Sequence, residues 1–230
     1  MSNPAAKPEN HIPPKIRVAV FGSFYRGYYV LSELLSGAVG SMLEIVGVAT
    51  DDPQQKFVSP QKRVWQYPHT VAERDMVKKL AQRAGIETYC GRVKTAEFYT
   101  LMEEKWKPDI CIMATFGQRI DARLYEYPSL GFYNLHPCID DTWPSRYAGS
   151  NPFQALLDDK REYIVIAMHR VDGNFDTGEL IAYSEKIFLP DHVNVIDLHK
   201  ITSPTAGKLA AREISSIITR EKADSNPGNK

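Results

Sequence analysis

Two side chains that could act together in chemistry, an amide and an imidazole, stand two residues apart at Asn134 and His136. If residues 131–136 form a strand, both side chains leave the same face of the sheet as Phe132, because side chains alternate along a strand. Since proline cannot continue a central ladder, we expect the strand to end at Pro137. The sequence thus predicts the pair at the carboxyl end of a strand, where open α/β sheets bind their ligands.

A segment that could supply a carboxylate to this pair is DGNFDTG, residues 172–178. In its simplest interpretation it is a hairpin turn, since Asp, Asn and Gly favour turns. An amide can donate to a developing oxyanion, an imidazole can carry a proton, and a carboxylate can orient the imidazole and favour its charged form. We expect Asp176 to be the partner of His136, with Gly178 taking a positive φ, while Asp172 opens the turn.

The composition excludes several classes of protein. The 230 residues are 43% hydrophobic and 24% charged, and 28 basic residues balance 28 acidic ones, so a broad nucleic-acid-binding surface is not expected. No apolar run is long enough to cross a bilayer, and the polar start of the chain has no secretory signal, which predicts a cytoplasmic protein. Cys90, Cys111 and Cys138 share no close spacing, so neither a disulfide framework nor a metal site is predicted.

Strand-like and helix-like segments alternate along the chain. Apolar runs at 16–21, 43–50, 109–115, 131–136, 163–171 and 179–187 predict strands, and residues 28–35, 70–84, 95–106, 151–159 and 193–219 predict helices. Thr70 and Glu73 form a capping-box pattern, and Gly85 would end that helix. The fold class predicted is α/β, a doubly wound, mostly parallel sheet with helices on both faces. It forms one domain at 15–220, between disordered tails at 1–14 and 221–230.

The turn after the first strand runs from Gly22 to Gly27 and could bind an anion at the start of a helix, with charge added by Arg26. It is neither the dinucleotide fingerprint nor a phosphate-binding P-loop, and a plain strand-to-helix turn is the alternative. The remaining histidines have no ligand pattern around them and are interpreted as surface or core residues: His11, His69, His169, His192 and His199.

Three ordered motifs, NLHP at 134–137, RYAGSNP at 146–152 and VDGNFDTGELI at 171–181, resemble the formyltransferase superfamily. That superfamily includes enzymes that formylate phosphoribosylglycinamide, methionyl-tRNA, sugar amines and hydroxyornithine. The resemblance covers roughly residues 16–218 and implies a Rossmann-like formyltransferase fold. It implies formyltetrahydrofolate as the donor and Asn134, His136 and Asp176 as catalytic residues. It also implies a donor pocket, to which we assign Asp172 and the segment Thr115, Phe116, Gly117, Gln118, Arg119 and Ile120.

The chain departs from the family pattern where the acceptor would bind. Residues 138–145 are longer than the usual form, and the first turn lacks the phosphate loop of the purine enzyme. The chain end also leaves no room for the C-terminal barrel of the methionyl-tRNA enzyme, so a tRNA acceptor is not expected. Parallel strands should bring the first turn and residues 138–145 to one crevice. The candidate acceptor contacts are therefore Gly22, Ser23, Arg26, Asp140, Asp141 and Trp143, although a plain exposed loop is the alternative for 138–145.

These observations favour formyl transfer from formyltetrahydrofolate to the amine or hydroxylamine of a small molecule, with a nucleotide sugar or hydroxyornithine preferred. Phosphoribosylglycinamide is the alternative acceptor. A formyltetrahydrofolate hydrolase, a nucleotide-binding oxidoreductase and a catalytically inactive binding module are less favoured alternatives. The oxidoreductase would leave Asn134 and His136 without a role. No nucleic-acid or membrane partner is expected, and homodimer formation is left open.

Overall fold

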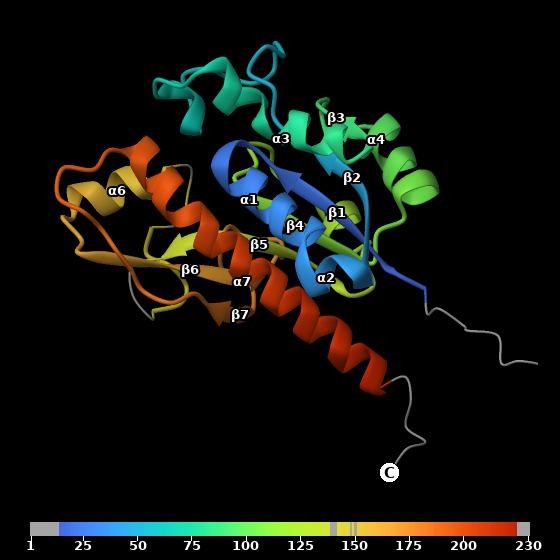
Figure 1. Cartoon of the computed structure of the whole chain (residues 1–230). Coiled ribbons are helices and arrows are strands. Elements are labelled where there is room, and N and C mark those ends of the chain that lie inside the picture. Colours follow the sequence, from blue (N-terminus) through green and yellow to red (C-terminus); the bar gives the residue numbers. More distant parts are fainter. Residues whose placement is uncertain (1–13, 139–141, 148, 150, 225–230) are drawn as a thin grey trace, which may run out of the picture.

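The computed structural model describes residues 14–138, 142–147, 149 and 151–224. One sheet runs through the molecule in the order β3-β2-β1-β4-β5-β6-β7, and β8 pairs with β6 outside that path (Figure 1). Neighbours from β3 to β5 are parallel, whereas β6 is antiparallel to β5, β7 and β8. This confirms the predicted mostly parallel α/β sheet. The strands are β1 Ile16–Gly22, β2 Leu43–Ala49, β3 Thr88–Tyr89, β4 Ile110–Ala114, β5 Gly131–Cys138, β6 Tyr163–Arg170, β7 Leu180–Tyr183 and β8 Ile187–Phe188.

Helices cover both faces of this sheet. On the face turned to the viewer in Figure 1, α1 and the long α7 lie side by side across the strands. A separate apolar cluster fills the opposite face, where side chains of β1, β4 and β5 meet those of α4 and η2. The helices are α1 Phe24–Leu35, α2 Gly37–Met42, the 3₁₀ turn η1 Arg63–Gln66, α3 Val71–Arg83, α4 Ala96–Thr100, the π-helical η2 Leu101–Trp106, α5 Ala122–Tyr125, α6 Pro152–Asp158 and α7 Val195–Asp224.

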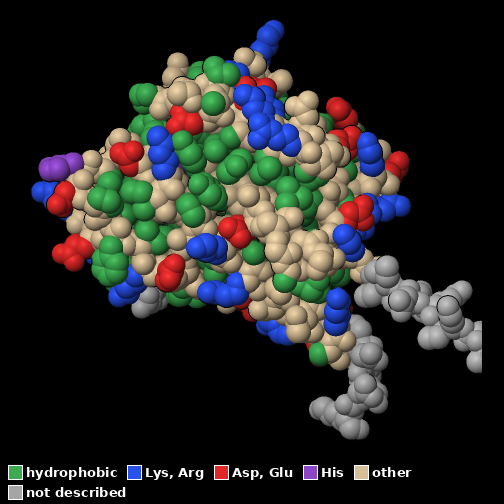
Figure 2. Space-filling view, viewed as in Figure 1, with side chains coloured by type: hydrophobic (Ala, Val, Ile, Leu, Met, Phe, Trp, Pro, Cys, Tyr) green, Lys and Arg blue, Asp and Glu red, His purple; other side chains and the backbone are tan. Residues whose placement is uncertain are grey.

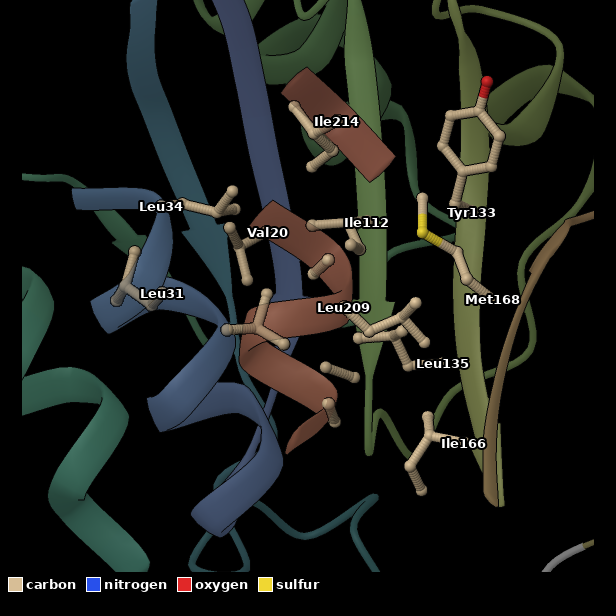
Figure 3. Close-up of a cluster of buried hydrophobic side chains, with 14 of the residues drawn as sticks. Val20, Leu31, Leu34, Ile112, Tyr133, Leu135, Ile166, Met168, Leu209 and Ile214 are labelled. Atoms are coloured by element: carbon tan, nitrogen blue, oxygen red, sulfur yellow. The ribbon is translucent and has the colours of Figure 1, made fainter. Parts of the chain in front are cut away.

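The larger core lies between the sheet and the pair α1 and α7 (Figure 3). Val20 and Ile112 point from the parallel strands toward Leu31 of α1 and Leu209 of α7, and all four side chains are fully or almost fully buried. Tyr133 and Leu135 of β5 point into this core, so the alternation along β5 sends Phe132, Asn134 and His136 to the other face, as predicted. Packing of one face of β5 thus fixes where the polar pair on the other face must lie.

The start of α1 differs from the prediction. The helix begins at Phe24 and not at residue 28, so Gly27 lies inside its first turns. A Cβ built on Gly27 would lie 2.6 Å from the carbonyl carbon of Gly22, and one on Gly22 would lie 2.8 Å from Gly27 Cα. The two glycines therefore allow the helix to pack against the end of β1. The strand-to-helix interpretation of these glycines accounts for them.

The strand that carries the polar pair does not end at Pro137. β5 continues to Cys138, and Pro137 pairs with Ile166 of β6. The Phe132 carbonyl accepts from the Val171 amide, so even-numbered residues of β5 point their backbone groups toward β6 and Pro137 points away from it. Pairing with β4 has already ended at Asn134, so no ladder hydrogen bond is lost at Pro137.

Other boundaries follow local chemistry. The predicted capping box is confirmed: the Thr70 hydroxyl accepts from the Glu73 amide, and the Glu73 carboxylate accepts from the Thr70 amide. Gly85, with φ of 69°, follows the helix as predicted. The strand predicted at 179–187 is two short strands, β7 and β8, which pair with different parts of β6. Residues 221–224, predicted as tail, continue α7, while residues 1–13 and 225–230 lie outside the described part of the chain.

The surface seen in Figure 2 mixes basic, acidic and apolar side chains, in keeping with a formal net charge of zero. Within the described ranges, no helix combines the length and the apolar character needed to cross a bilayer.

Candidate active site

A cavity of about 400 Å³ opens where the parallel strands end. Asn134 and His136 of β5 line it, together with Asp176 of the hairpin loop between β6 and β7. The same cavity reaches the loop after β4 and the first residues of α6. All three residues predicted to be catalytic therefore line one cavity, of the size that small-molecule sites require.

Asn134 is held by two acceptors. Its Nδ2 donates to Asp176 Oδ1 at 3.0 Å and lies 3.1 Å from His169 Nε2. His169 Nδ1 lies 2.9 Å from the carbonyl oxygen of Arg170, so this imidazole is a donor at Nδ1 and an acceptor at Nε2. Both amide hydrogens of Asn134 are thus used, and the Asp176 carboxylate fixes the orientation of the amide because its oxygen would repel Asn134 Oδ1.

His136 also lies between two acceptors. Its Nδ1 is 3.4 Å from Asp176 Oδ2, and its Nε2 is 3.2 Å from the carbonyl oxygen of Tyr147. A neutral imidazole has one hydrogen and can satisfy one of them, whereas the protonated ring can donate to both. Burial nevertheless lowers the pKa of His136 to about 4, and the negative charge of Asp176 offsets only part of that effect.

The charge states of the pair follow from this balance. With this pKa His136 is neutral at neutral pH, because Asp176 favours the charged form, as expected, but does not outweigh burial. Burial acts to raise the pKa of Asp176, but the neighbouring imidazoles of His169 and His136 and the backbone amide of Gly149 outweigh it and leave the pKa below its ordinary value. Asp176 is therefore an anion, placed to stabilise a proton that arrives on His136 during a reaction.

The hairpin loop achieves this placement with an unusual backbone. Asp176 itself takes the left-handed conformation, with φ of 51°, whereas Gly178 does not. A Cβ on Gly178 would collide with the carbonyl oxygen of Arg170, so glycine is required there for a close backbone approach. The positive φ expected for Gly178 was wrong. Asp172 Oδ1 accepts from the Asn174 amide and caps the turn, as predicted.

The segment predicted to form the donor pocket lines the cavity throughout, and so does Asp172: Thr115, Phe116, Gly117, Gln118, Arg119 and Ile120. Thr115, directly after β4, has φ of 57°, a strained conformation typical of functional sites. Gln118 fixes the loop by accepting from the Val93 amide and donating to the Gly91 carbonyl. Arg119 places its guanidinium over the Phe175 ring at 5.0 Å, which joins this loop to the hairpin.

The residues predicted to contact the acceptor fall into different places. Arg26 lines the cavity, whereas Gly22 packs on Gly27 and the Ser23 hydroxyl accepts from the Asp51 amide at 2.9 Å. Trp143 does not line the cavity. Its indole lies 4.8 Å from the His169 ring and donates to the Gly178 carbonyl at 2.9 Å, so it supports the loop that carries Asp176.

Asp140 and Asp141, the other two predicted acceptor contacts, lie outside the described residues.

Among the cavity residues that were not predicted, three carry ionisable side chains at notable positions. His169 and His199, interpreted from the sequence as surface or core residues, are buried and line the cavity. Asp51 follows β2 at the same edge of the sheet and accepts from the Gly117 amide. Burial raises its pKa to about 6, although the Gly117 hydrogen bond and the charge of Arg63 act in the opposite direction. Its place directly after a parallel strand is the signal that could have identified it.

The profile of the formyl transferase family matches residues 15–199. Methionyl-tRNA formyltransferase of Syntrophomonas wolfei is 28% identical over 189 residues, which are 82% of this chain and 55% of that protein. The enzyme of the same name from Bacillus licheniformis is 29% identical over 185 residues, 79% of this chain and 54% of that protein. The chain thus spans about half the length of the curated relatives it matches.

Solved structures show the same fold at lower identity. Phosphoribosylglycinamide formyltransferase from Anaplasma phagocytophilum superposes with a TM-score of 0.65 at 14% identity, covering 87% of this chain and 85% of that one. A formyltetrahydrofolate deformylase from Pseudomonas syringae gives a TM-score of 0.63 at 16% identity, covering 87% of this chain and 60% of that one.

Proposed function

The chain belongs to the formyl transferase family, and on that premise we propose that it transfers a formyl group from formyltetrahydrofolate to the amine of a small molecule. The observation that carries the proposal is the junction of Asn134, His136 and Asp176 in a cavity walled by residues 115–120. Backbone groups of that loop suit a flat heterocycle with alternating donors and acceptors, such as a pteridine.

Formyl transfer requires changes in bonding and charge that the protein must assist. The acceptor nitrogen forms a bond to the formyl carbon, negative charge develops on the formyl oxygen, and the bond to the folate nitrogen then breaks. The amine loses a proton, which passes through neutral His136 to the leaving nitrogen. While it is protonated, His136 can donate to both Asp176 and the Tyr147 carbonyl, so these two acceptors stabilise the positive charge on the imidazole.

Asn134 serves the formyl oxygen in this mechanism. Both of its amide hydrogens are already used, so one bond must be exchanged for the bond to the oxyanion. The bond to His169 is the one to exchange, because the bond to the Asp176 carboxylate is assisted by charge and is the stronger. A donor of this kind contributes ~3 kcal/mol to the stabilisation of the transition state.

The identity of the acceptor is a separate part of the proposal. The relatives reported above are named for methionyl-tRNA and for phosphoribosylglycinamide. Their names do not support the nucleotide sugar or hydroxyornithine preferred from the sequence. We retain a small-molecule amine, with phosphoribosylglycinamide as the alternative, because the cavity has the volume of a small-molecule site and the formal charge of the chain is zero.

Incubation with formyltetrahydrofolate and a panel of amines tests the proposal. Tetrahydrofolate is measured together with formate and with the N-formyl product. Amine-dependent release of tetrahydrofolate, with one N-formyl product for each turnover, is the expected result. Amine-independent release with formate would identify a hydrolase, the activity named for the Pseudomonas syringae structure. No release under any condition would contradict both activities.

A further inference from the structure

Arg26 is a buried cation with no anionic partner. Its side chain belongs to α1, the residue is 3% exposed, and it lines the cavity. One long hydrogen bond, 3.5 Å from Nη2 to Thr202 Oγ1, is its polar contact among the described residues, and its Nε has no partner. Burial lowers the pKa of Arg26 to about 10, so it keeps its charge at neutral pH. A buried charge without a partner is costly, and that cost is expected to be recovered by a ligand.

A second unpartnered polar group lies beside it. His199 of α7 is 7% exposed, lines the same cavity, and has no hydrogen-bond partner at Nδ1. Its ring is held edge-on between Phe24 at 5.5 Å and Phe153 at 4.6 Å, and the guanidinium of Arg26 lies 5.2 Å over the Phe153 ring. Aromatic packing therefore fixes one guanidinium and one imidazole in a recess of the cavity that contains His136.

We propose that Arg26 and His199 bind a carboxylate of the acceptor, so that the substrate class is an amino acid or another amine bearing one carboxylate. This inference rests on the formyl transfer proposed above and specifies its acceptor. A guanidinium presents two parallel N–H groups that match the two oxygens of a carboxylate, and an imidazole can donate a third hydrogen bond. One buried positive charge is balanced by one negative charge, which favours a carboxylate over a phosphate dianion.

The position of the recess also links binding to chemistry. Burial is the main reason that the pKa of His136 is low, and the positive charge of Arg26 adds to the effect. A carboxylate on Arg26 would offset the last of these contributions and make His136 a better proton acceptor when the acceptor amine is in place. An acceptor without the carboxylate would leave Arg26 unpaired. It would therefore bind weakly, and His136 would be a weaker base toward its amine.

Calorimetric binding without the donor tests the recess by itself. The probes are γ-aminobutyrate, n-propylamine, which lacks only the carboxylate, and aminopropylphosphonate, which replaces it. Wild type is expected to prefer γ-aminobutyrate over propylamine by at least about 30-fold, the usual effect of a desolvated charge pair. Arg26→Met should abolish that preference, and Arg26→Lys should keep part of it because the charge remains. Arg26→Gln replaces the Met variant if circular dichroism shows that the latter is unfolded.

The outcomes separate the recess from the reaction. His136→Asn should lose formyl transfer and keep the preference for γ-aminobutyrate, so loss of transfer alone leaves the anion site standing. Equal binding of γ-aminobutyrate and propylamine to wild type, or an unchanged preference in Arg26→Met, would overturn the proposal. Tighter binding of the phosphonate would overturn the choice of a carboxylate. Weaker binding of formyltetrahydrofolate to Arg26→Met, with amine binding unchanged, would assign the recess to the donor.

Discussion

At the scale of single residues, His136 is the group that we expect to move the proton lost by the acceptor amine. Because this imidazole is neutral and flanked by two acceptors, it can take a proton and be stabilised at once. His136→Asn should therefore lower the turnover of formyl transfer by at least ~100-fold, the usual worth of a positioned acid–base group, while the protein stays folded. Single-turnover kinetics and circular dichroism measure the two effects.

His192→Asn is the matched control for that substitution. His192 is exposed, does not line the cavity, and has φ of 61°, which Asn tolerates. Its variant should turn over at the wild-type rate. Turnover of His136→Asn within a few-fold of wild type would remove His136 from the mechanism.

Removal of the charge from each of the two carboxylates of the hairpin loop should have very different effects on kcat. Asp176 contacts Asn134 and His136, whereas Asp172 caps the turn by accepting from the Asn174 amide. Asp176→Asn keeps the size and the left-handed backbone and removes the charge, so we expect kcat to fall ~100-fold or more. Asp172→Asn should stay within a few-fold, because Asn can form the same turn. The reverse ranking in steady-state kinetics would exchange the two assignments.

The same residues show what sequence reasoning can reach. Asn134, His136 and Asp176 were predictable because their types and local spacing carry a chemical meaning. Arg26 was predicted as an acceptor contact, but its lack of an anionic partner was not, and His169 was interpreted as a surface or core residue. Both properties depend on another element: His169 meets Asn134 across the β5–β6 pair, and Arg26 contacts Thr202 of α7. Whether a polar side chain has a partner is a property of tertiary packing.

At the scale of elements, the hairpin between β6 and β7 requires a glycine at one of its two glycine positions, Gly178, and not at the other, Gly173. A Cβ on Gly178 would overlap the Arg170 carbonyl oxygen, whereas a Cβ on Gly173 would meet Tyr125 Oη at 3.6 Å, an ordinary contact. Gly178→Ala should therefore destabilise the fold by ~1–3 kcal/mol and displace Asp176, with a large loss of turnover. Urea unfolding and kinetics together measure both effects.

Gly173→Ala is the control within the same loop and should leave stability and turnover close to wild type. An equal effect of the two substitutions would mean that loop flexibility, and not the contact with Arg170, sets the position of Asp176.

Elements were predictable where one local rule decides them. The capping box at Thr70 and the alternation along β5 are rules of that kind. Pro137 was predicted to end the strand because proline interrupts a ladder. Its backbone faces β4, however, and the pairing of β5 with β4 already stops at Asn134. The register of neighbouring strands decides such a case, and register depends on contacts between residues distant in sequence.

At the scale of the whole molecule, the donor should protect loops that join different strands. If formyltetrahydrofolate fills the cavity beside residues 115–120, a folate analogue should slow backbone hydrogen exchange there and in the hairpin at 172–176. Mass spectrometry of peptides from both loops measures the effect, and α2, which lies away from the cavity, serves as the internal reference. Protection confined to residues 22–27 would favour a nucleotide at the first turn.

The buried site should also make the stability of the molecule depend on pH, with two contributions of opposite sign. The pKa of His136 falls from 6.5 to about 4 on folding, so as the pH drops below 6.5 the unfolded chain binds a proton that the folded chain does not, and stability is lost. The pKa of Asp51 rises from 3.8 to about 6, so between those values the folded chain holds the extra proton, and acidification stabilises it.

Urea unfolding at pH 7.5 and pH 5 separates these contributions. Between the two conditions His136→Asn should lose about 2 kcal/mol less stability than wild type, because it lacks the histidine that only the unfolded chain protonates. Asp51→Asn should lose about 1 kcal/mol more, because it lacks the compensating carboxyl group. Identical losses in all three proteins would show that neither group titrates differently on folding. The pKa of His136 would then stay near 6.5, so a minor fraction of the imidazole would be protonated at neutral pH.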